Sequence, residues 1–181
     1  QNPLTISSDL ISFTAFANEG LPSAASSKGV EYIIEPTKTF PRNSEGAFIT
    51  LKDGSILFCY TQFYGGADDH SQARLVKIQS KDQGRTWSEP STVLENQAGY
   101  NVMSVSLLRL NQGKIAMFYL EKNSLLDCIP YAKFSEDEGK TWSEAVRMID
   151  APGYFVLNND RVIQTEKGRL IAPLAFHRSK G

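Results

Sequence analysis

Three adjacent residues, Asp68, Asp69 and His70, combine two carboxylates with an imidazole, groups that transfer protons and bind metals. Three neighbours in a sequence rarely converge on one ion, so we expect no metal here. Arg42 adds a guanidinium, whose fork of N–H donors matches a carboxylate through two parallel hydrogen bonds. If the fold gathers carboxylates, cations and amides around one central opening, that opening suits the binding of a sugar, and especially of an acidic sugar.

Similar polar residues recur in other short segments that flank apolar runs. They are Asn43, Glu45, Tyr100, Asn101, Asn159, Asp160, Arg161 and His177. Both histidines of the chain belong to the combined set. The sequence predicts that these residues bind substrate if the fold brings their segments together; the alternative is that each is simply a solvated loop residue.

The apolar runs between these segments form a repeated hairpin. The copies are ITLKDGSILFCY at 49–60, SLLRLNQGKIAMFYL at 106–120 and VIQTEKGRLIAPLAF at 162–176. Each turns at a glycine (Gly54, Gly113 or Gly168), which accepts the positive φ that a tight hairpin needs. These glycines lie 59 and 55 residues apart, a period typical of β-propellers, in which each unit supplies several short strands.

The period divides most of the chain into four-stranded units without helical periodicity. Strands are expected at 47–51, 55–62, 72–79 and 92–95, and again at 105–110, 114–121, 129–134 and 146–150. One more, in GVEYIIEPT at 29–37, would complete the last unit of a closed ring with a partner outside this chain. We therefore predict a partial propeller over 1–181, with an N-terminal segment (1–39), blade one (40–98), blade two (99–152) and the start of blade three (153–181).

A second motif occurs twice, as SKDQGRTWSEP at 80–90 and SEDEGKTWSEA at 135–145. In a tight turn an aspartate carboxylate can accept hydrogen bonds from nearby backbone N–H groups, and a tryptophan can bury its ring against the neighbouring unit. We expect architecture rather than catalysis from Asp82, Asp137, Trp87 and Trp142.

Strand direction sorts the loops onto two faces, because antiparallel strands alternate in direction. The glycine turns and the repeated motifs fall on one face. The candidate site residues fall in the second-to-third-strand loops and in the connections between units, which share the other face. The sequence thus predicts one polar site on the face opposite the motifs.

The pattern S-x-D-x-G-x-T-W at 80–87 and 135–142 resembles the Asp-box, or BNR repeat, of sialidases and related glycosidases. The resemblance runs from about Phe40 to the C-terminus. It implies an all-β, six-bladed β-propeller of the sialidase type, of which this chain holds about the N-terminal half. It also implies an exo-glycoside hydrolase acting on glycans with acidic sugars, an exo-alpha-sialidase or a close relative. The box also occurs outside sialidases, so it predicts the fold more specifically than the reaction.

The resemblance also implies roles for individual residues. Arg42, within Phe40-Pro41-Arg42-Asn43, resembles the family's carboxylate-binding arginine, although the order of the motif differs. Asp69, 13 residues before Asp82, resembles the catalytic acid, with Asp68 as the alternative. Ser104 stands where the family has a second aspartate, which leaves the identity of the sugar open. The nucleophilic tyrosine, its glutamate and the other arginines are expected beyond Gly181.

Two other functions remain open. His70 or Tyr100 could act as the base of a polysaccharide lyase on uronate-containing glycans, with Arg42 neutralising the carboxylate. Alternatively, the propeller could be a non-catalytic platform that binds carbohydrate.

Composition narrows the partners. The net charge of −1 gives no basic surface for nucleic acid, and no apolar run is long enough to cross a membrane. No cofactor is expected. The chain begins Gln-Asn-Pro without a methionine, from which we expect a removed export signal and a secreted or periplasmic protein. The expected partners are a glycan substrate and either the missing C-terminal half of the propeller or a second chain.

Overall fold

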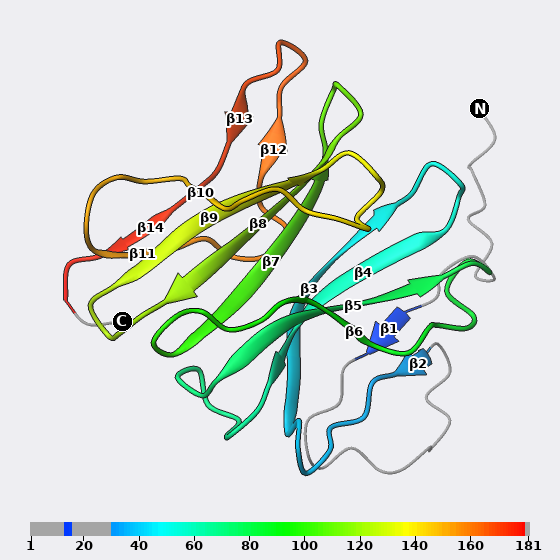
Figure 1. The fold of residues 1–181 in the computed structure, drawn as a ribbon, viewed down its shortest axis with the longest axis horizontal. Helices are drawn as coiled ribbons and strands as arrows, with labels where there is room; N and C mark the ends of the chain where they lie inside the picture. The colour runs from blue at the N-terminus through cyan, green and yellow to red at the C-terminus, as the bar shows by residue number, and fades with distance from the viewer. Residues whose placement is uncertain (1–12, 16–29, 180–181) are drawn as a thin grey trace, which may run out of the picture.

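A computed structural model describes residues 13–15 and 30–179, and every regular element in them is a β-strand (Figure 1). The all-β prediction is confirmed, and these residues contain no helix that could span a membrane. Strand β2 (Val30–Ile33) forms where a strand was predicted. It pairs in parallel with β1 (Phe13–Ala15), whereas the sequence analysis placed its partner outside the chain. The Gln-Asn-Pro start and Gly181 lie outside the described residues.

The first unit is a four-stranded antiparallel sheet. Its strands are β3 (Arg42–Thr50), β4 (Ile56–Phe63), β5 (Ala73–Ser80) and β6 (Ser91–Leu94), in that spatial order. Successive side chains of a strand point to opposite faces. On β4, Leu57 and Cys59 pack into one core cluster, while Phe58 and Tyr60 pack into another. Burial on both faces therefore explains why the strand begins with an apolar run from Ile56 to Tyr60.

The second unit repeats this arrangement. Its strands are β7 (Asn101–Arg109), β8 (Ile115–Lys122), β9 (Cys128–Ser135) and the short β10 (Val146–Arg147), each antiparallel to its neighbour. Beyond it, β11 (Tyr154–Val156) pairs with β14 (Ala175–His177) on the outer edge of β9, and β12 (Ile163–Gln164) forms a hairpin with β13 (Leu170–Ile171). That hairpin confirms the third predicted repeat of the glycine turn.

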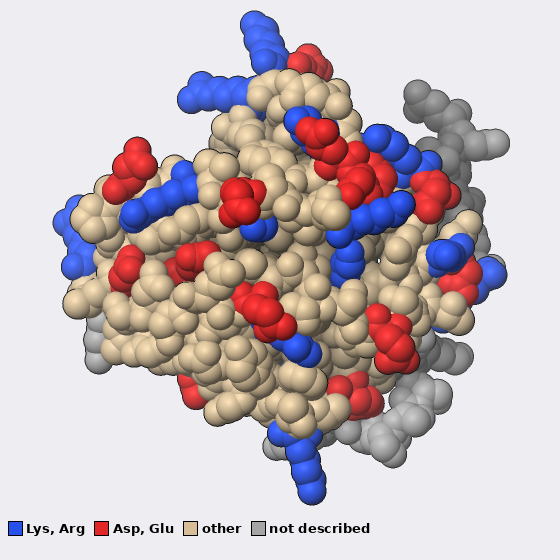
Figure 2. Space-filling model, in the orientation of Figure 1, with Lys and Arg blue, Asp and Glu red and all other residues tan. Residues whose placement is uncertain are grey.

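The two large sheets pack side by side through their first strands, β3 and β7, which run through the middle of the molecule (Figure 1). The core cluster between them includes Leu57 and Leu75 from the first unit and Leu107, Met117 and Tyr119 from the second. Within the described residues the sheets do not close into a ring. On the face drawn in Figure 2, acidic and basic side chains are interspersed.

Each repeated motif folds around its aspartate in the same way. The Asp82 carboxylate accepts hydrogen bonds from Thr86 N at 2.8 Å, Thr86 Oγ1 at 2.7 Å and Ser80 Oγ at 2.9 Å. The Asp137 carboxylate accepts the equivalent bonds from Thr141 and Ser135. Because these donors favour the ionised form, they lower the pKa of Asp82 to about 2 and lower that of Asp137 as well. The carboxylates are therefore used inside their own turns.

These lowered pKa values predict how the free energy of unfolding changes at acid pH. The bonds need ionised carboxylates, so their contribution is present above the ordinary pKa of 3.8 and is lost as the pH falls towards about 2. We expect the double variant Asp82→Asn and Asp137→Asn to lose part of that pH dependence, measured by urea unfolding at a series of pH values. Glu144→Gln, which removes an exposed carboxylate at the end of the second motif, is the control. An unchanged slope in the double variant would contradict this account.

The second motif also docks onto the first unit. Glu138 accepts a hydrogen bond from the backbone N–H of Lys52, in the first unit, at 2.9 Å. Its carboxylate also forms an ion pair with Arg109, in the second unit, at 2.7 Å. Lys77 Nζ donates to the carbonyl of Gly139 at 2.6 Å. A Cβ on Gly139 would lie 2.9 Å from Leu57 Cδ2, and the φ of this residue is +77°, so only glycine fits this contact without strain. The motif is thus a connector between successive units.

Candidate functional site

The candidate residues meet where β3 and β7 begin and where β4 and β8 end. Antiparallel pairing brings these four strand ends to one side of the sheets. Arg42 is the first residue of β3, Asn101 is the first of β7, and Asp69 lies in the loop between β4 and β5. Side-chain contacts link all three, as described below, so this part of the predicted site is assembled in the structure.

Arg42 is fixed on one side only. Its Nη1 donates to Asp69 Oδ1 at 2.6 Å and to the carbonyl of Ala67 at 3.2 Å. Its Cζ lies 4.4 Å from the centre of the Phe63 ring, and the side chain is 19% exposed. The Nε and Nη2 atoms make no hydrogen bond to any residue that the structure describes. The guanidinium is therefore held in place while one edge remains available to an anion.

The two adjacent aspartates differ in their surroundings. The Asp69 side chain is 64% exposed and pairs with Arg42. Asp68 accepts hydrogen bonds from His70 N at 2.7 Å and Ser71 Oγ at 2.9 Å, which lower its pKa and shape the loop. A lowered pKa is the reverse of what a proton donor needs, because such a group must be protonated at the working pH. The geometry therefore gives Asp68 a structural task.

Two buried polar side chains of the second unit hold the loop at Asp69. Asn101 Nδ2 donates to the carbonyls of Asp69 at 3.0 Å and Ser71 at 2.9 Å, and this residue is fully buried. Lys122 Nζ donates to the same Asp69 carbonyl at 3.2 Å and is 4% exposed. The sequence analysis missed Lys122. The available signal was a lysine ending an apolar strand, directly opposite Asn101 in the hairpin.

Glu45 lies at a bulge that recurs in each unit. The pairing of β3 with β4 is irregular between Ser44 and Ala47, and that of β7 with β8 is irregular between Met103 and Ser106. Glu45 has φ +50° and Ser104 has φ +59°, values that residues other than glycine rarely adopt. Asp160, in the connection before β12, has φ +55°. The three positions are 59 and 56 residues apart and so follow the repeat.

Hydrogen bonds join these three positions across the units. Ser104 Oγ donates to Glu45 Oε2 at 3.2 Å. Asp160 N donates to Ser106 Oγ at 2.6 Å, and Asn159 Nδ2 donates to the carbonyl of Gly46 at 3.3 Å. We call Glu45, Ser104, Asn159 and Asp160 the axial group. Burial raises the pKa of Glu45, although the Ser104 hydrogen bond and Arg42 oppose that effect.

The remaining candidate residues do not take part in the contacts around Arg42. Asn43 is buried inside the first sheet, where it accepts a hydrogen bond from Gln62. The rings of His70 and Tyr100 are 5.5 Å apart, at the edge of the Asp69 loop. Arg161 lines a separate hollow of about 400 Å³ beside β11 and β14. His177 on β14 is exposed, and its ring lies 5.1 Å from that of the buried Tyr154.

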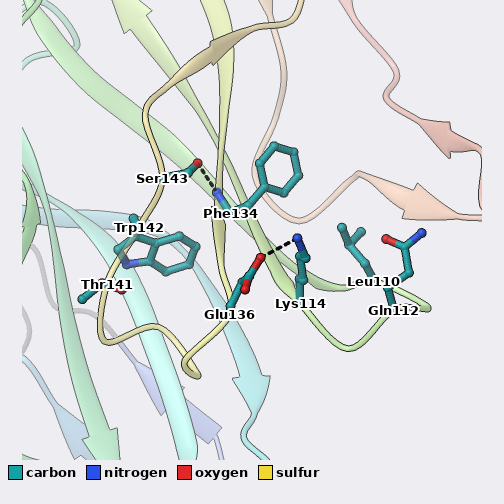
Figure 3. Close-up of a pocket in the computed structure, with 8 residues that line it drawn as sticks. All are labelled: Leu110, Gln112, Lys114, Phe134, Glu136, Thr141, Trp142 and Ser143. Atoms are coloured by element: carbon teal, nitrogen blue, oxygen red, sulfur yellow. Dashed lines mark hydrogen bonds and ion pairs between the residues drawn. The ribbon is translucent and has the colours of Figure 1, made fainter.

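A hollow of about 640 Å³ lies on the opposite face, beside the second motif (Figure 3). Trp142 and Phe134 line one side of it and Leu110 the other, with an ion pair between Lys114 and Glu136 in between. The equivalent turn of the first unit, 59 residues earlier, is occupied by Glu138 and Lys140 of the next unit's motif. The hollow therefore matches a seam between units rather than a substrate site.

No group of three or more histidine, cysteine, aspartate or glutamate residues in the described ranges is arranged to hold a metal ion. The candidate site lies on the strand-end face, where β3 and β7 begin. It contains the guanidinium of Arg42, one edge of which has no hydrogen bond to the described residues, and the exposed carboxylate of Asp69 that pairs with it. It also contains the axial group, in which the Glu45 carboxyl is partly buried.

Comparisons with known proteins agree with this architecture. The BNR repeat-like domain family matches residues 59–181. A search of curated proteins finds no match. Among solved structures, a Hadza microbial sialidase is similar, with a TM-score of 0.63 and 17% identity over 76% of this chain and 33% of that one.

Two further solved structures have the same fold. The intramolecular trans-sialidase from Ruminococcus gnavus matches with a TM-score of 0.60 and 14% identity, over 77% of this chain and 56% of that one. The NanB sialidase from Streptococcus pneumoniae matches with a TM-score of 0.60 and 11% identity, over 81% of this chain and 42% of that one. This chain thus spans between 33% and 56% of the length of these three relatives. Because the family model matches more than half of the chain, the chain belongs to the BNR repeat-like domain family.

Proposed function

We propose that this protein is a sialidase-like exo-glycoside hydrolase that acts on glycans with acidic sugars, an exo-alpha-sialidase or a close relative. The proposal includes a six-bladed propeller of which this chain supplies about the N-terminal half. The observation that carries it is the free edge of Arg42 beside the carboxylate of Asp69. An arginine held by one nitrogen and by an aromatic ring is preorganised to receive a carboxylate through two hydrogen bonds.

The chemistry follows from these groups. Arg42 would bind the carboxylate of the terminal sugar and so orient its glycosidic bond. A nearby carboxylic acid would then protonate the leaving oxygen, the role that the resemblance assigns to Asp69. Neighbours that are called sialidases or trans-sialidases support this substrate class, although their identity to this chain is low.

The contact between His70 and Tyr100 supports a second candidate, elimination at a uronate. Their rings lie 5.5 Å apart at the edge of the same loop. One of them would remove the proton beside the carboxylate that Arg42 neutralises, and the products would carry an unsaturated uronate. This keeps the preference for acidic sugars and changes the reaction.

One assay separates the candidates. The complete protein is incubated with a panel of sialosides, uronate-containing glycans and neutral glycans, and the products are examined by mass spectrometry and ultraviolet absorbance. Release of a saturated acidic monosaccharide supports the hydrolase. An unsaturated uronate product supports the lyase instead. Binding of a glycan without turnover would leave a carbohydrate-binding platform, and activity confined to neutral glycans would contradict the proposal.

A further inference from the structure

We infer that Asn101 is a positioning residue for the proton donor Asp69, so that the second unit sets the geometry of an acid carried by the first. The inference rests on the proposed hydrolase function, in which Asp69 protonates the leaving oxygen. It adds a residue that acts through Asp69 rather than on the substrate. It is carried by hydrogen bonds from Asn101 to two backbone carbonyls of the loop between β4 and β5.

Asn101 is built into the second sheet and directed at the first unit. It is the first residue of β7, it pairs with Lys122 of β8, and it is fully buried. A side-chain amide has two N–H donors. Its Nδ2 gives one to the carbonyl of Asp69 at 3.0 Å and the other to the carbonyl of Ser71 at 2.9 Å. Both donors are therefore used on one loop of the neighbouring unit.

Asp69 is consequently held at its backbone and at the tip of its side chain. Its Oδ1 accepts Arg42 Nη1 at 2.6 Å, whereas its backbone carbonyl accepts Asn101 and also Lys122 Nζ at 3.2 Å. The first contact comes from the unit that carries Asp69, and the other two come from the next unit. A residue fixed at both places has few rotamers left, so its carboxyl group is kept in one direction.

The loop also has hydrogen bonds of its own, but these shape its turn rather than place it. His70 N and Ser71 Oγ donate to the Asp68 carboxylate, and Ser71 N donates to the Asp68 carbonyl at 3.1 Å. All of these bonds lie within residues 68–71 and would move together if the turn tilted. Among the described residues, Asn101 is the side chain that ties two carbonyls of this turn to a buried strand. It therefore sets where the turn lies.

The position of the acid matters because proton transfer acts over a short range. In the proposed step the Asp69 proton moves to the glycosidic oxygen, and the bond from that oxygen to the anomeric carbon breaks with its electron pair going to the oxygen. The leaving group departs as an alcohol, water supplies a hydroxyl group to the anomeric carbon, and the second proton of that water returns to Asp69. The donor must lie about 2.6–3.2 Å from the oxygen, and a displacement of about 1 Å can cost ~10²-fold in rate.

The first test compares leaving groups in the complete protein. In Asn101→Ala, kcat for an alkyl glycoside of the acidic sugar should fall by ~10–100-fold, whereas kcat for an activated aryl glycoside, which needs little protonation, should fall much less. KM should change little for either substrate, because Arg42 still binds the carboxylate. Loss of folded protein would lower both rates equally, so an unchanged ratio of alkyl to aryl turnover would overturn the inference.

Asn111→Ala is the matched control. Asn111 Nδ2 also donates to two backbone carbonyls of the following unit, those of Thr165 at 3.3 Å and Glu166 at 3.2 Å, between glycine turns at the other end of the strands. Its replacement removes the same kind of contact between units and should leave the alkyl-to-aryl ratio unchanged. An equal shift in both variants would mean that contact between units in general, and not the placement of Asp69, supports turnover.

A second variant keeps the inference testable if Asn101→Ala fails to fold. Lys122→Met removes the other donor to the Asp69 carbonyl, and the loss of a buried charge should not weaken the fold. It should lower the alkyl-to-aryl ratio in the same direction but by less, because it removes one bond from the turn instead of two. An unchanged ratio in Lys122→Met, with Asn101→Ala unfolded, would refute the inference.

A double-mutant cycle shows whether Asn101 acts through Asp69. Asp69→Asn removes the proton donor, so adding Asn101→Ala to it should change alkyl-glycoside turnover by no more than ~2-fold. Two losses that multiply would mean that Asn101 supports turnover by another route, and the inference would be wrong.

Hydrogen exchange separates the placement of the turn from the proposed function. The amides of residues 64–71 should exchange faster in Asn101→Ala than in the wild type, but not in Asn111→Ala. Unchanged exchange would show that other contacts hold the turn, and it would overturn the inference. If the wild-type protein cleaves no glycoside of an acidic sugar, the proposed function fails and the positioning role fails with it. An active wild type whose alkyl-to-aryl ratio is unaffected by Asn101→Ala would instead refute only the positioning role.

Discussion

Replacing Arg42 with lysine is expected to weaken binding of a carboxylate-bearing glycoside by about 10–100-fold, while binding of a neutral glycoside stays nearly unchanged. Lysine keeps the charge and loses the planar fork, and a hydrogen bond to a charged group contributes about 1.5–3 kcal/mol. The stacking of the guanidinium on Phe63 at 4.4 Å is also lost, so the remaining ammonium is less well positioned. Isothermal calorimetry or KM values for the two substrates measure the effect.

Arg74→Lys is the matched control for this experiment. Arg74 also stacks on an aromatic ring, that of Phe40 at 4.7 Å, and it donates two hydrogen bonds to Gln62. It lies within the first sheet and pairs with Glu95 at 3.7 Å rather than with Asp69. Its replacement should affect unfolding more than substrate binding. Equal losses of affinity in the two variants would mean that Arg42 supports the fold rather than the substrate.

Lys122→Met is expected to raise the free energy of unfolding by about 1–3 kcal/mol and, at the same time, to reduce turnover. Lys122 is 4% exposed, and its Nζ has one hydrogen bond, to the Asp69 carbonyl. No ion pair joins it to a carboxylate of the described residues, and its Nζ lies 5.5 Å from the centre of the Tyr154 ring. A buried charge with so little compensation costs more in desolvation than its contacts return, so an apolar side chain of similar length should stabilise the core.

The loss of turnover in Lys122→Met has a separate cause. Without Nζ, the Asp69 carbonyl keeps only the amide of Asn101, and the loop that pairs with Arg42 becomes less fixed. Chemical denaturation and steady-state kinetics on the same variant measure the two effects. Lys114→Met, which removes a partly exposed ion pair with Glu136, should change the free energy of unfolding by no more than about 0.5 kcal/mol. If Lys122→Met unfolds more easily than the wild type, the charge is better compensated than its contacts indicate.

The fold was predictable where the sequence repeats itself. The glycine turns and the apolar runs beside them predicted β4, β5, β8 and β9 to within one residue, because hairpin chemistry and burial are local properties. The prediction was wrong for the starts of β3 and β7, which begin five and four residues earlier, so that Arg42 and Asn101 lie in strands rather than in connections. The pairing of β1 with β2 was not predictable, because parallel pairing joins segments without a turn between them. The β10 strand was predicted at 146–150 and spans only Val146–Arg147, which pair with Ala132 and Tyr131 of β9.

The candidate site was predictable in part. Arg42 and Asp69 meet as strand parity predicts, since loop order alone places them on one face. The exposure of Asp69 and the internal position of Asn43 depend on side-chain direction, which spacing along the chain does not specify. The bulges at Glu45 and Ser104 carry no distinctive residue type, so only the structure identifies the axial group. Lys122 was missed because its partner is a backbone carbonyl rather than another side chain.

Glu138 binds the turn of the preceding unit, and this contact gives the series of repeats a direction along the sequence. The turn of the first unit receives a carboxylate from the unit that follows it, because Lys52 contacts Glu138, and the equivalent place at Leu110 and Lys114 stays open in the described residues. In repeat proteins, stability is approximately the sum of the stabilities of the units and of the contacts between neighbouring units. A unit without the contact from the following unit is therefore expected to unfold first. A further unit that follows in the sequence would therefore have an open hollow of about 640 Å³ to dock against, and we expect its contact to stabilise the second unit.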